Sequence, residues 1–353
     1  MSETIAVRHE EELPLERLEP YLRAQLAGAE GPLSIRQFGG GHANLTYLLR
    51  FGEREFVLRR PPHGPLPAGA HDMQREYRVL SRLHRSFALA PRAYLLCTDP
   101  ALIGADFVVM ERRTGLALRG ELPEPLAGDG ALQRRLGKRF VETLVQLHAV
   151  DYQAAELADL GRPEGYLRRQ VEGWSARWTA ADSPERPEAS GVIAWLLQRM
   201  PGERAPAIVH NDYKLDNVLV APNDLARVVA VLDWDMCTLG DPLADLGYLL
   251  ALWSQAEDPT SWWLGAMPTR AGGFPRRREL VERYARKSGR DCAAIGWYYV
   301  FNVFRYAVIG QQIYVRFLRG QTHDERFAHF GRHVSAGIER AHALIGEPQQ
   351  GLG

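Results

Sequence analysis

The chain has 353 residues, of which 46% are hydrophobic and 24% are charged, close to the average for soluble globular proteins. This composition excludes disorder, collagen and coiled coil as descriptions of the whole chain. Lys and Arg together number 43, and so do Asp and Glu, so the formal net charge is zero. A charge-driven attraction of the whole chain to nucleic acid or to an anionic membrane is therefore not expected.

The first hundred residues look β-rich, with strand-like segments from residue 33 onwards. The first three are separated by Gly-rich turns, which predicts an antiparallel meander. A helix should follow them, because Met73, Tyr77 and Leu80 recur at spacings of three and four. Gly115 then marks a change of pattern. The strands are expected at 33–38, 44–51, 55–60, 92–97 and 105–111, and the helix at 71–87.

After residue 130 the hydrophobic pattern becomes mainly helical. Asp241 and Pro242 should start one of these helices, with Asp as the N-cap and Pro in the first helical position. The coarse prediction is an α+β chain, with a small β lobe containing one helix and a larger helical lobe holding a short hairpin. Helices are expected at 132–147, 164–180, 191–200 and from 242 to about 346, and short buried strands at 207–210, 217–220 and 228–234.

The cellular compartment is predicted from the cysteines and the N-terminal segment. The three cysteines, Cys97, Cys237 and Cys292, are widely spaced and form no Cys-x-x-Cys pair, which fits a reducing compartment. Residues 1–22 contain no apolar signal-peptide core, and no apolar run approaches the roughly 18 residues of a membrane span. We expect a cytoplasmic protein with no nucleic-acid or membrane partner, and its oligomeric state stays open.

The strongest chemical signal is the pattern His210-x-Asp212-x-Lys214-x-x-Asn217, followed by Asp233. Phosphoryl transfer from Mg-ATP needs a carboxylate to orient the acceptor hydroxyl, oxygen ligands for Mg²⁺ and a cation near the moving phosphoryl group. Asp212 can be that carboxylate, Asn217 and Asp233 can supply the oxygen ligands, and Lys214 can be the cation. The pattern lies between two apolar strands, and Asp233 is expected at the end of the second one. His210 is expected to brace the loop.

Longer segments around these residues resemble the aminoglycoside phosphotransferase and choline kinase family, which is related to the protein kinases. The resembling segments are VHNDYKLDNVLV (209–220), VLDWDMCTLGDPLADLGYLL (231–250), FGGGHANLTYLLR (38–50) and FVLRRPP (56–62). The second and fourth look closest to the subgroup that is fused to acyl-CoA dehydrogenases in some animals.

This resemblance implies a two-lobed protein kinase-like fold, with a nucleotide-binding lobe over 1–112 and a catalytic, substrate-binding helical lobe over 113–353. It also implies that Asp212 is the catalytic base, that Asn217 and Asp233 bind Mg²⁺, and that the phosphoryl donor is ATP or GTP. Asp233 would take the place of the aspartate in the kinase Asp-Phe-Gly motif. Asp235 either assists there or has a surface or helix-capping role.

Nucleotide phosphates are expected at a Gly-rich turn between the first two strands. Gly39, Gly40 and Gly41 would let backbone N–H groups approach phosphates without a Cβ in the way. Asn44 stands where a kinase loop has its last Gly, and an ordinary Gly-rich hairpin turn is the alternative interpretation. Along the chain order of a kinase, the backbone of Met110 to Arg112 would meet the adenine ring.

A cation on the third strand should contact the α- and β-phosphates, but no lysine precedes Lys138. Aligning FVLR with the kinase pattern puts Arg59 in this place, and alternation along a strand favours Arg59 over Arg60. Glu76 on the following helix is the expected partner, because Arg forks onto carboxylate oxygens. The missing lysine also leaves open a nucleotide-binding pseudokinase that acts as a regulator.

The acceptor is the least determined part of the prediction. Residues 254–331 contain 12 Arg and Lys against 7 Asp and Glu, including the consecutive Arg276, Arg277 and Arg278. A positive lobe suits an anionic or CoA-linked hydroxy compound, whereas a polycationic aminoglycoside calls for an acidic pocket; solvated helix faces are the alternative explanation of these arginines. A protein kinase is disfavoured, because no Asp-Phe-Gly or Ala-Pro-Glu segment follows. The sequence therefore predicts a small-molecule kinase, with an aminoglycoside phosphotransferase as an alternative.

Overall fold

The computed structural model describes residues 3–39, 44–63, 71–258, 267–322, 324–347, 349 and 352. The chain forms two compact units, which are built from interleaved segments. Unit 1 comprises residues 1–115, 151–160 and 229–237, and unit 2 comprises residues 116–150, 161–228 and 238–353. The boundary between a nucleotide-binding lobe and a catalytic lobe, placed between residues 112 and 113, stays a prediction.

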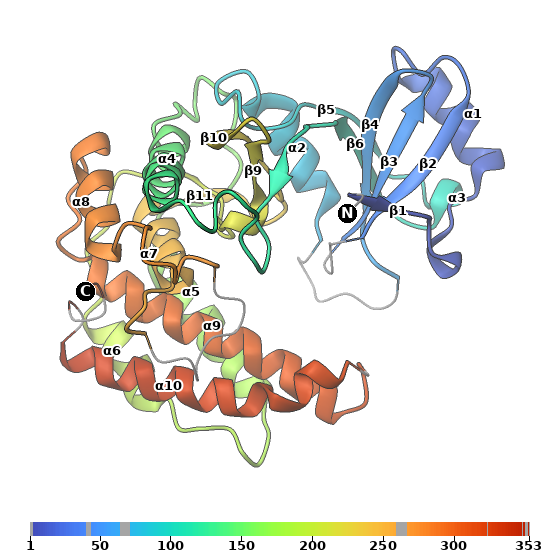
Figure 1. Ribbon diagram of the computed structural model, residues 1–353. Helices are drawn as coiled ribbons and strands as arrows, with labels where there is room; N and C mark the ends of the chain where they lie inside the picture. The colour runs from blue at the N-terminus through green and yellow to red at the C-terminus, as the bar shows by residue number, and fades with distance from the viewer. Residues whose placement is uncertain are drawn as a thin grey trace. The chain divides into compact units, whose positions relative to one another are not determined.

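Unit 1 is built on a six-stranded sheet in the order β1-β2-β3-β4-β6-β5 (Figure 1). Every neighbouring pair in it is antiparallel. β2, β3 and β4 are consecutive neighbours, so the predicted meander is confirmed. The strands are β1 (Thr4–Ile5), β2 (Leu33–Phe38), β3 (Leu45–Phe51), β4 (Arg54–Arg60), β5 (Ala93–Cys97) and β6 (Phe107–Glu111).

Alternate residues of these strands separate the two faces of the sheet. One face joins helix α1 (Leu15–Gln25) in a single hydrophobic core, to which β4 contributes Phe56 and Leu58. Because successive side chains of a strand point to opposite faces, Val57 and Arg59 lie on the other face. The predicted helix is α2 (Met73–Leu83), whose N-cap Asp72 accepts a hydrogen bond from the backbone N–H of Arg75. The sequence analysis did not predict α1, β1 or the short helices η1 (His9–Glu11) and α3 (Pro100–Ile103).

The strands of unit 2 are short. β9 (Val218–Ala221) lies between β10 (Asp224–Val231) and β7 (Leu116–Ala117), and β8 (Ala207–Val209) pairs with β11 (Thr238–Gly240). The strand expected over 228–234 is wrong in its bounds, because β10 starts right after a two-residue turn from β9 and ends at Val231. Asp233 therefore does not end a strand. It follows two residues later, at a φ of 70°.

Seven helices of more than eight residues lie in the described part of unit 2. The predicted start of α7 is confirmed, since Asp241 accepts a hydrogen bond from Leu243 N (2.9 Å) and Pro242 takes the first position. α9 packs along α7 and α10, and its run of aromatic residues from Trp297 to Phe304 is buried. In the described ranges, no helix is both long and apolar enough to cross a membrane. The helices are α4 (Gly130–His148), α5 (Tyr166–Ala180), α6 (Ser190–Gln198), α7 (Pro242–Leu252), α8 (Arg277–Ser288), α9 (Ile295–Leu318) and α10 (Phe330–Gly346), with the 3₁₀ turns η2 (Leu215–Asn217) and η4 (Glu325–His329).

Candidate active site

Asp212 lies in the loop between β8 and η2, and three side chains hold its carboxylate. The hydroxyl of Tyr248 donates to Oδ1 at 2.6 Å, and Nδ2 of Asn217 donates to Oδ2 at 2.7 Å. The ammonium of Lys214 lies 3.2 Å from Oδ2. The structure thus brings together Asp212, Lys214 and Asn217 within unit 2, as a carboxylate with a fixed orientation beside a cation.

The amide of Asn217 is oriented by its hydrogen bonds. Its Nδ2 donates both to the Asp212 carboxylate and to the Asp212 main-chain oxygen, at 2.7 and 2.9 Å. Because an amide nitrogen has two hydrogens, both are used, and Oδ1 points away from Asp212. A carbonyl-type oxygen is the ligand that Mg²⁺ prefers, so this side chain fits a metal ligand.

The loop that carries Asp212 is anchored by Asp245 on α7. Its two carboxylate oxygens accept the backbone N–H groups of His210 and Asn211, at 2.6 and 2.7 Å. Asn211 has a φ of 65°, an uncommon conformation for a residue other than Gly. Buried hydrogen bonds to a charged acceptor are the strong kind, so Asp245 can hold this strained turn. The ring of His210 also braces the loop, since its Nδ1 accepts a hydrogen bond from Asp212 N (3.3 Å).

A buried histidine completes the anchor. His148 on α4 lies with Nε2 3.2 Å from the Asp245 carboxylate and with Nδ1 2.7 Å from the hydroxyl of Tyr284. Burial lowers the pKa of His148, although Asp245 acts to raise it. A neutral ring that donates from Nε2 and accepts from the tyrosine satisfies both contacts. The pKa of Asp245 is lowered from its ordinary value: burial acts to raise it, but the hydrogen bonds from His148 and His210 outweigh burial.

Two further side chains fix Asn211, the residue before Asp212. Nη2 of Arg305 donates to the main-chain oxygen of Asn211 at 2.8 Å, and the hydroxyl of Tyr166 donates to its Oδ1 at 2.9 Å. With Asp245 on the backbone nitrogen, the main-chain nitrogen, the main-chain oxygen and the side-chain oxygen of Asn211 each have a partner. The position of Asp212 is therefore set by helices α5, α7 and α9.

Within unit 1 the structure brings together Arg59, Glu76 and Asp233. Nη1 of Arg59 donates to Oε1 of the fully buried Glu76, and Nη2 donates to Oδ1 of Asp233 at 2.7 Å. Burial alone would lower the pKa of Arg59, but the two carboxylates raise it above its ordinary value. Arg60 points to the other face, where its Nη1 donates to the main-chain oxygen of Ile103 (2.9 Å). Of the two arginines, the one facing these carboxylates is Arg59.

Contacts with α2 and its flanking loop position the segment that carries Asp233. The N–H of Val231 donates to the main-chain oxygen of Leu89 (2.8 Å), and the Trp234 ring packs edge-on against Phe87 with centroids 6.1 Å apart. Asp233 keeps part of its side chain exposed, at 27%. Its carboxylate can accept about four hydrogen bonds or ligands, so binding Arg59 leaves room for a metal.

Asp235 is linked to the residue after the Gly-rich turn. Asn44 donates from Nδ2 to Oδ2 of Asp235 at 3.3 Å, and its Oδ1 lies 2.8 Å from Nδ1 of His71. Burial, followed by the neighbouring charge of Asp233, raises the pKa of Asp235. Asp235 therefore ties Asn44, the residue before β3, to the segment of Asp233. This contact is side chain to side chain, not a helix cap.

The remaining predicted nucleotide contacts are placed in part. Gly39 directly follows β2, while Gly40 and Gly41 lie outside the described residues. Met110 is buried in β6 opposite Val57 of β4. The Arg112 side chain binds Glu3 and lies 5.1 Å over the Phe38 ring, so only its backbone is left for a base.

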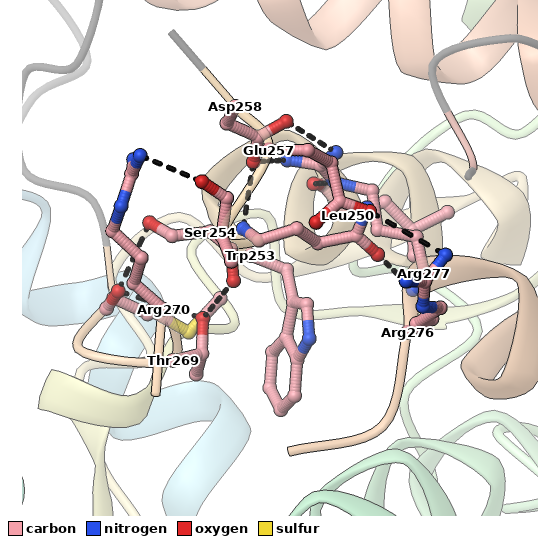
Figure 2. Close-up of polar contacts among 12 residues, drawn as sticks. Leu250, Trp253, Ser254, Glu257, Asp258, Thr269, Arg270, Arg276 and Arg277 are labelled. Atoms are coloured by element: carbon pink, nitrogen blue, oxygen red, sulfur yellow. Dashed lines mark hydrogen bonds and ion pairs between the residues drawn. The ribbon is translucent and has the colours of Figure 1, made fainter. Parts of the chain in front are cut away.

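The arginine triplet of unit 2 is not an open anion-binding patch, because each member contacts a carboxylate. Arg276 lies 3.5 Å from Glu257, and Arg278 lies 3.1 Å from Glu282. Arg277 is only 1% exposed, and its Nη1 donates to Asp258 at 2.9 Å, while Nε donates to the Leu250 main-chain oxygen (Figure 2). Arg277 thus joins the ends of α7 and α8, so this triplet gives no support for an anionic acceptor.

Three residues of the site were missed in the sequence: Asp245, Tyr248 and Arg305. A signal existed for the first, since Asp245 is the single charge in the apolar run of α7 and a lone buried charge needs partners. No sequence signal marked Tyr248, because aromatic residues in an apolar helix are ordinary core. Arg305 directly follows the aromatic run of α9, and nothing in that apolar stretch of sequence marks it as a site residue.

An antiparallel sheet with a buried arginine–glutamate pair, and a helical unit with an Asp-x-Lys-x-x-Asn loop, define the chain as a protein kinase-like phosphotransferase. Residues 34–290 match the phosphotransferase enzyme family, APH, and the chain belongs to this family. The resemblance found in the sequence and the predicted fold class are both confirmed.

The curated relatives are longer than this chain. Acyl-CoA dehydrogenase family member 11 of Gallus gallus is 33% identical over 347 residues, which cover 96% of this chain and 44% of that protein. Acyl-CoA dehydrogenase family member 10 of Mus musculus is 32% identical over 321 residues, covering 90% of this chain and 30% of that protein. The chain therefore spans less than half the length of these two relatives.

Solved structures share the fold over their whole length. The crystal structure of a candidate aminoglycoside phosphotransferase from Ralstonia eutropha has a TM-score of 0.79 at 30% identity, covering 95% of this chain and 99% of that one. Choline kinase from Cryptosporidium parvum has a TM-score of 0.60 at 11% identity, covering 95% of each chain. A ternary complex of aminoglycoside phosphotransferase APH(4)-Ia with ADP and hygromycin B has a TM-score of 0.58 at 16% identity, covering 92% of this chain and 99% of that one. These last two show the fold alone.

Proposed function

We propose that this protein is a small-molecule kinase, which transfers the γ-phosphoryl group of Mg-ATP or Mg-GTP to a hydroxyl group. The observation that carries the proposal is the carboxylate of Asp212, which is held on both oxygens and lies 3.2 Å from the ammonium of Lys214. A fixed carboxylate beside a cation is what in-line phosphoryl transfer requires of the protein.

Asp212 is the proposed general base. The acceptor oxygen forms a bond to the γ-phosphorus while the bond from that phosphorus to the β,γ-bridging oxygen breaks, and the nucleoside diphosphate leaves. The proton of the acceptor hydroxyl moves to Asp212. Lys214 stays charged, since burial acts to lower its pKa but Asp212 raises it above the ordinary value. Its ammonium is proposed to meet the γ-phosphate.

The metal and the nucleotide have proposed ligands in this chain. Asn217 offers its amide oxygen and Asp233 its partly exposed carboxylate, and bound Mg²⁺ would neutralise phosphate charge. Arg59, oriented by Glu76, would contact the α- and β-phosphates. The backbone of Gly39, Gly40, Gly41 and Asn44 would lie over the phosphates, and that of Met110 to Arg112 would bind the base.

For the acceptor we propose a hydroxyacyl group carried as a CoA thioester. Relatives at 30% identity or more over about nine-tenths of this chain are named as acyl-CoA dehydrogenase family members, and more than half of each lies outside the match. A kinase domain joined to an enzyme named for acyl-CoA chemistry would share its class of substrate. The similarity to APH(4)-Ia, at 16% identity, shows the fold alone, and the Ralstonia protein, at 30% identity, is named only as a candidate aminoglycoside phosphotransferase.

The first test is nucleotide binding. Thermal unfolding is measured with Mg-ATP, Mg-GTP, Mg²⁺ alone and ATP with EDTA. At a hundredfold excess over Kd, binding should add about 2.7 kcal/mol of stability. A shift that needs both metal and nucleotide supports the proposal, and no shift with any nucleotide refutes it.

The second test is turnover. The wild type and Asp212→Asn are incubated with radiolabelled ATP and, separately, a hydroxyacyl-CoA, hygromycin B or choline. We expect label in the hydroxyacyl-CoA, and a rate for Asp212→Asn that is lower by roughly 10²–10⁴-fold with Mg-ATP binding retained. Label in another acceptor refutes the acyl-CoA proposal only. Binding without turnover on any hydroxyl would favour the pseudokinase, for which the arginine in place of the usual lysine is the motivating observation.

A further inference from the structure

We propose that Tyr248 is a positioning residue of the phosphoryl-transfer reaction, which fixes the rotation of the Asp212 carboxylate through its hydroxyl. This inference rests on the proposed function. The contact that carries it is the 2.6 Å hydrogen bond from the Tyr248 hydroxyl to Oδ1 of Asp212.

The position of Tyr248 on α7 makes this contact specific. Tyr248 follows Asp245 by three residues, so both side chains lie on the same face of the helix. Asp245 accepts the backbone N–H groups of His210 and Asn211, while Tyr248 reaches the side chain of the next residue, Asp212. One face of one helix therefore sets both the backbone of the catalytic loop and the orientation of its carboxylate.

The tyrosine can only act as a donor here. Burial, with the neighbouring charge of Asp212 second, raises the pKa of Tyr248 well above its ordinary value, so the hydroxyl keeps its proton at neutral pH. That single proton points to Asp212. The residue is 3% exposed, and the guanidinium of Arg305 lies 4.7 Å from the centre of its ring. Arg305 is itself fixed by its bond to the main chain of Asn211.

Removing the hydroxyl should release one side of the carboxylate. Oδ1 is held by Tyr248, whereas Oδ2 is held by Asn217 and by the ammonium of Lys214. Without Tyr248 only the Oδ2 side is fixed, and the carboxylate can rotate about its Cβ–Cγ bond. Because small errors in the placement of a reacting group cost up to about 10²-fold in rate, we expect a loss in kcat. Because nucleotide binding does not use this contact, the KM for ATP should stay close to the wild-type value.

The test is Tyr248→Phe, with Tyr314→Phe as the matched control. Tyr314 also donates its hydroxyl to a carboxylate, that of Glu185 at 3.1 Å, and lies on α9 outside the proposed site. We expect kcat of Tyr248→Phe to fall roughly 10- to 100-fold, with KM for ATP within about twofold of the wild type. Tyr314→Phe should keep the wild-type rate. A kcat for Tyr248→Phe within twofold of the wild type overturns the inference.

A double-mutant cycle separates positioning from a general structural effect. If Tyr248 acts through Asp212, adding Tyr248→Phe to Asp212→Asn should cost less than twofold in residual rate. If the two losses multiply, Tyr248 acts elsewhere and the inference fails.

A readout without turnover covers the case in which the proposed function itself is wrong. Crystal structures of the wild type and Tyr248→Phe are compared at the side chain of Asp212. A rotated or doubly placed carboxylate in the variant is expected, and an unchanged one overturns the inference. Absence of nucleotide binding in the wild type would instead count against the proposed function.

Discussion

Asp245→Asn should destabilise the protein and slow it, because one carboxylate holds two consecutive backbone N–H groups in a fully buried place. Asp245 is 0% exposed and accepts from His210 N at 2.6 Å and from Asn211 N at 2.7 Å, each on a different oxygen. The amide of asparagine has the same shape but only one acceptor oxygen. In either orientation, an NH₂ group faces one of the two backbone N–H groups.

The size of the effect follows from that count. One buried N–H that loses its acceptor costs about 1–3 kcal/mol, and the bond that survives loses its charge assistance, worth about 1 kcal/mol. We therefore expect Asp245→Asn to lower the free energy of unfolding by about 2–4 kcal/mol, a large part of the roughly 5–15 kcal/mol that holds a typical domain folded. The turn at Asn211, whose φ is 65°, should relax as well and displace Asp212.

The assay is urea unfolding at equilibrium, together with the phosphoryl-transfer rate. Asp182→Asn is the matched control, because that side chain is 74% exposed and makes one surface ion pair with Arg186 at 3.2 Å. Such a pair contributes about 0–1 kcal/mol. If Asp245→Asn unfolds within 0.5 kcal/mol of the control and keeps the wild-type rate, the reasoning about the loop anchor is refuted.

Three further predictions concern ionisable side chains. Arg59→Met leaves the Glu76 carboxylate buried without its cation and should lower the free energy of unfolding by about 3–5 kcal/mol. The double variant Arg59→Met with Glu76→Leu should recover part of this loss, and an additive loss in it would contradict the prediction. Asp233→Asn should abolish the dependence of ATP binding on Mg²⁺ in calorimetry, and an unchanged dependence would remove Asp233 from the metal site. The pKa of His148 is lowered from 6.5 by burial, so below pH 6.5 the unfolded chain binds more protons than the folded one and stability falls as pH drops. Below pH 6.5, the slope of the unfolding free energy against pH should reach up to about 1.4 kcal/mol per pH unit in the wild type and should be shallower in His148→Gln. Equal slopes in the two proteins would show that His148 is not the group responsible.

Much of the fold could be predicted from the sequence, because its signals are local. Strand-like segments bounded by turn residues marked β2 to β6. The pair Asp241-Pro242 marked the start of α7, since an N-cap and a first-turn proline act on their own helix end. The spacing of Asp212, Lys214 and Asn217 was also local. A single loop places all three, so the phosphotransferase interpretation did not need a tertiary structure.

What only the tertiary structure decided are the contacts between residues far apart in the chain. The alternation of side chains along β4 favoured Arg59 over Arg60. The guanidinium of Arg59, however, binds Glu76 and Asp233, which lie 17 and 174 positions away in the chain. The tyrosine of α7 that reaches Asp212 looked like any core aromatic. The buried pair of Arg277 with Asp258 looked like surface charge. Hydrophobic period and turn chemistry fix where a side chain faces on its own element, whereas its partner is fixed only when elements pack. For that reason the sequence determined the class of chemistry, and the packing of α4, α5, α7 and α9 determined how the carboxylate of Asp212, the proposed general base, is held.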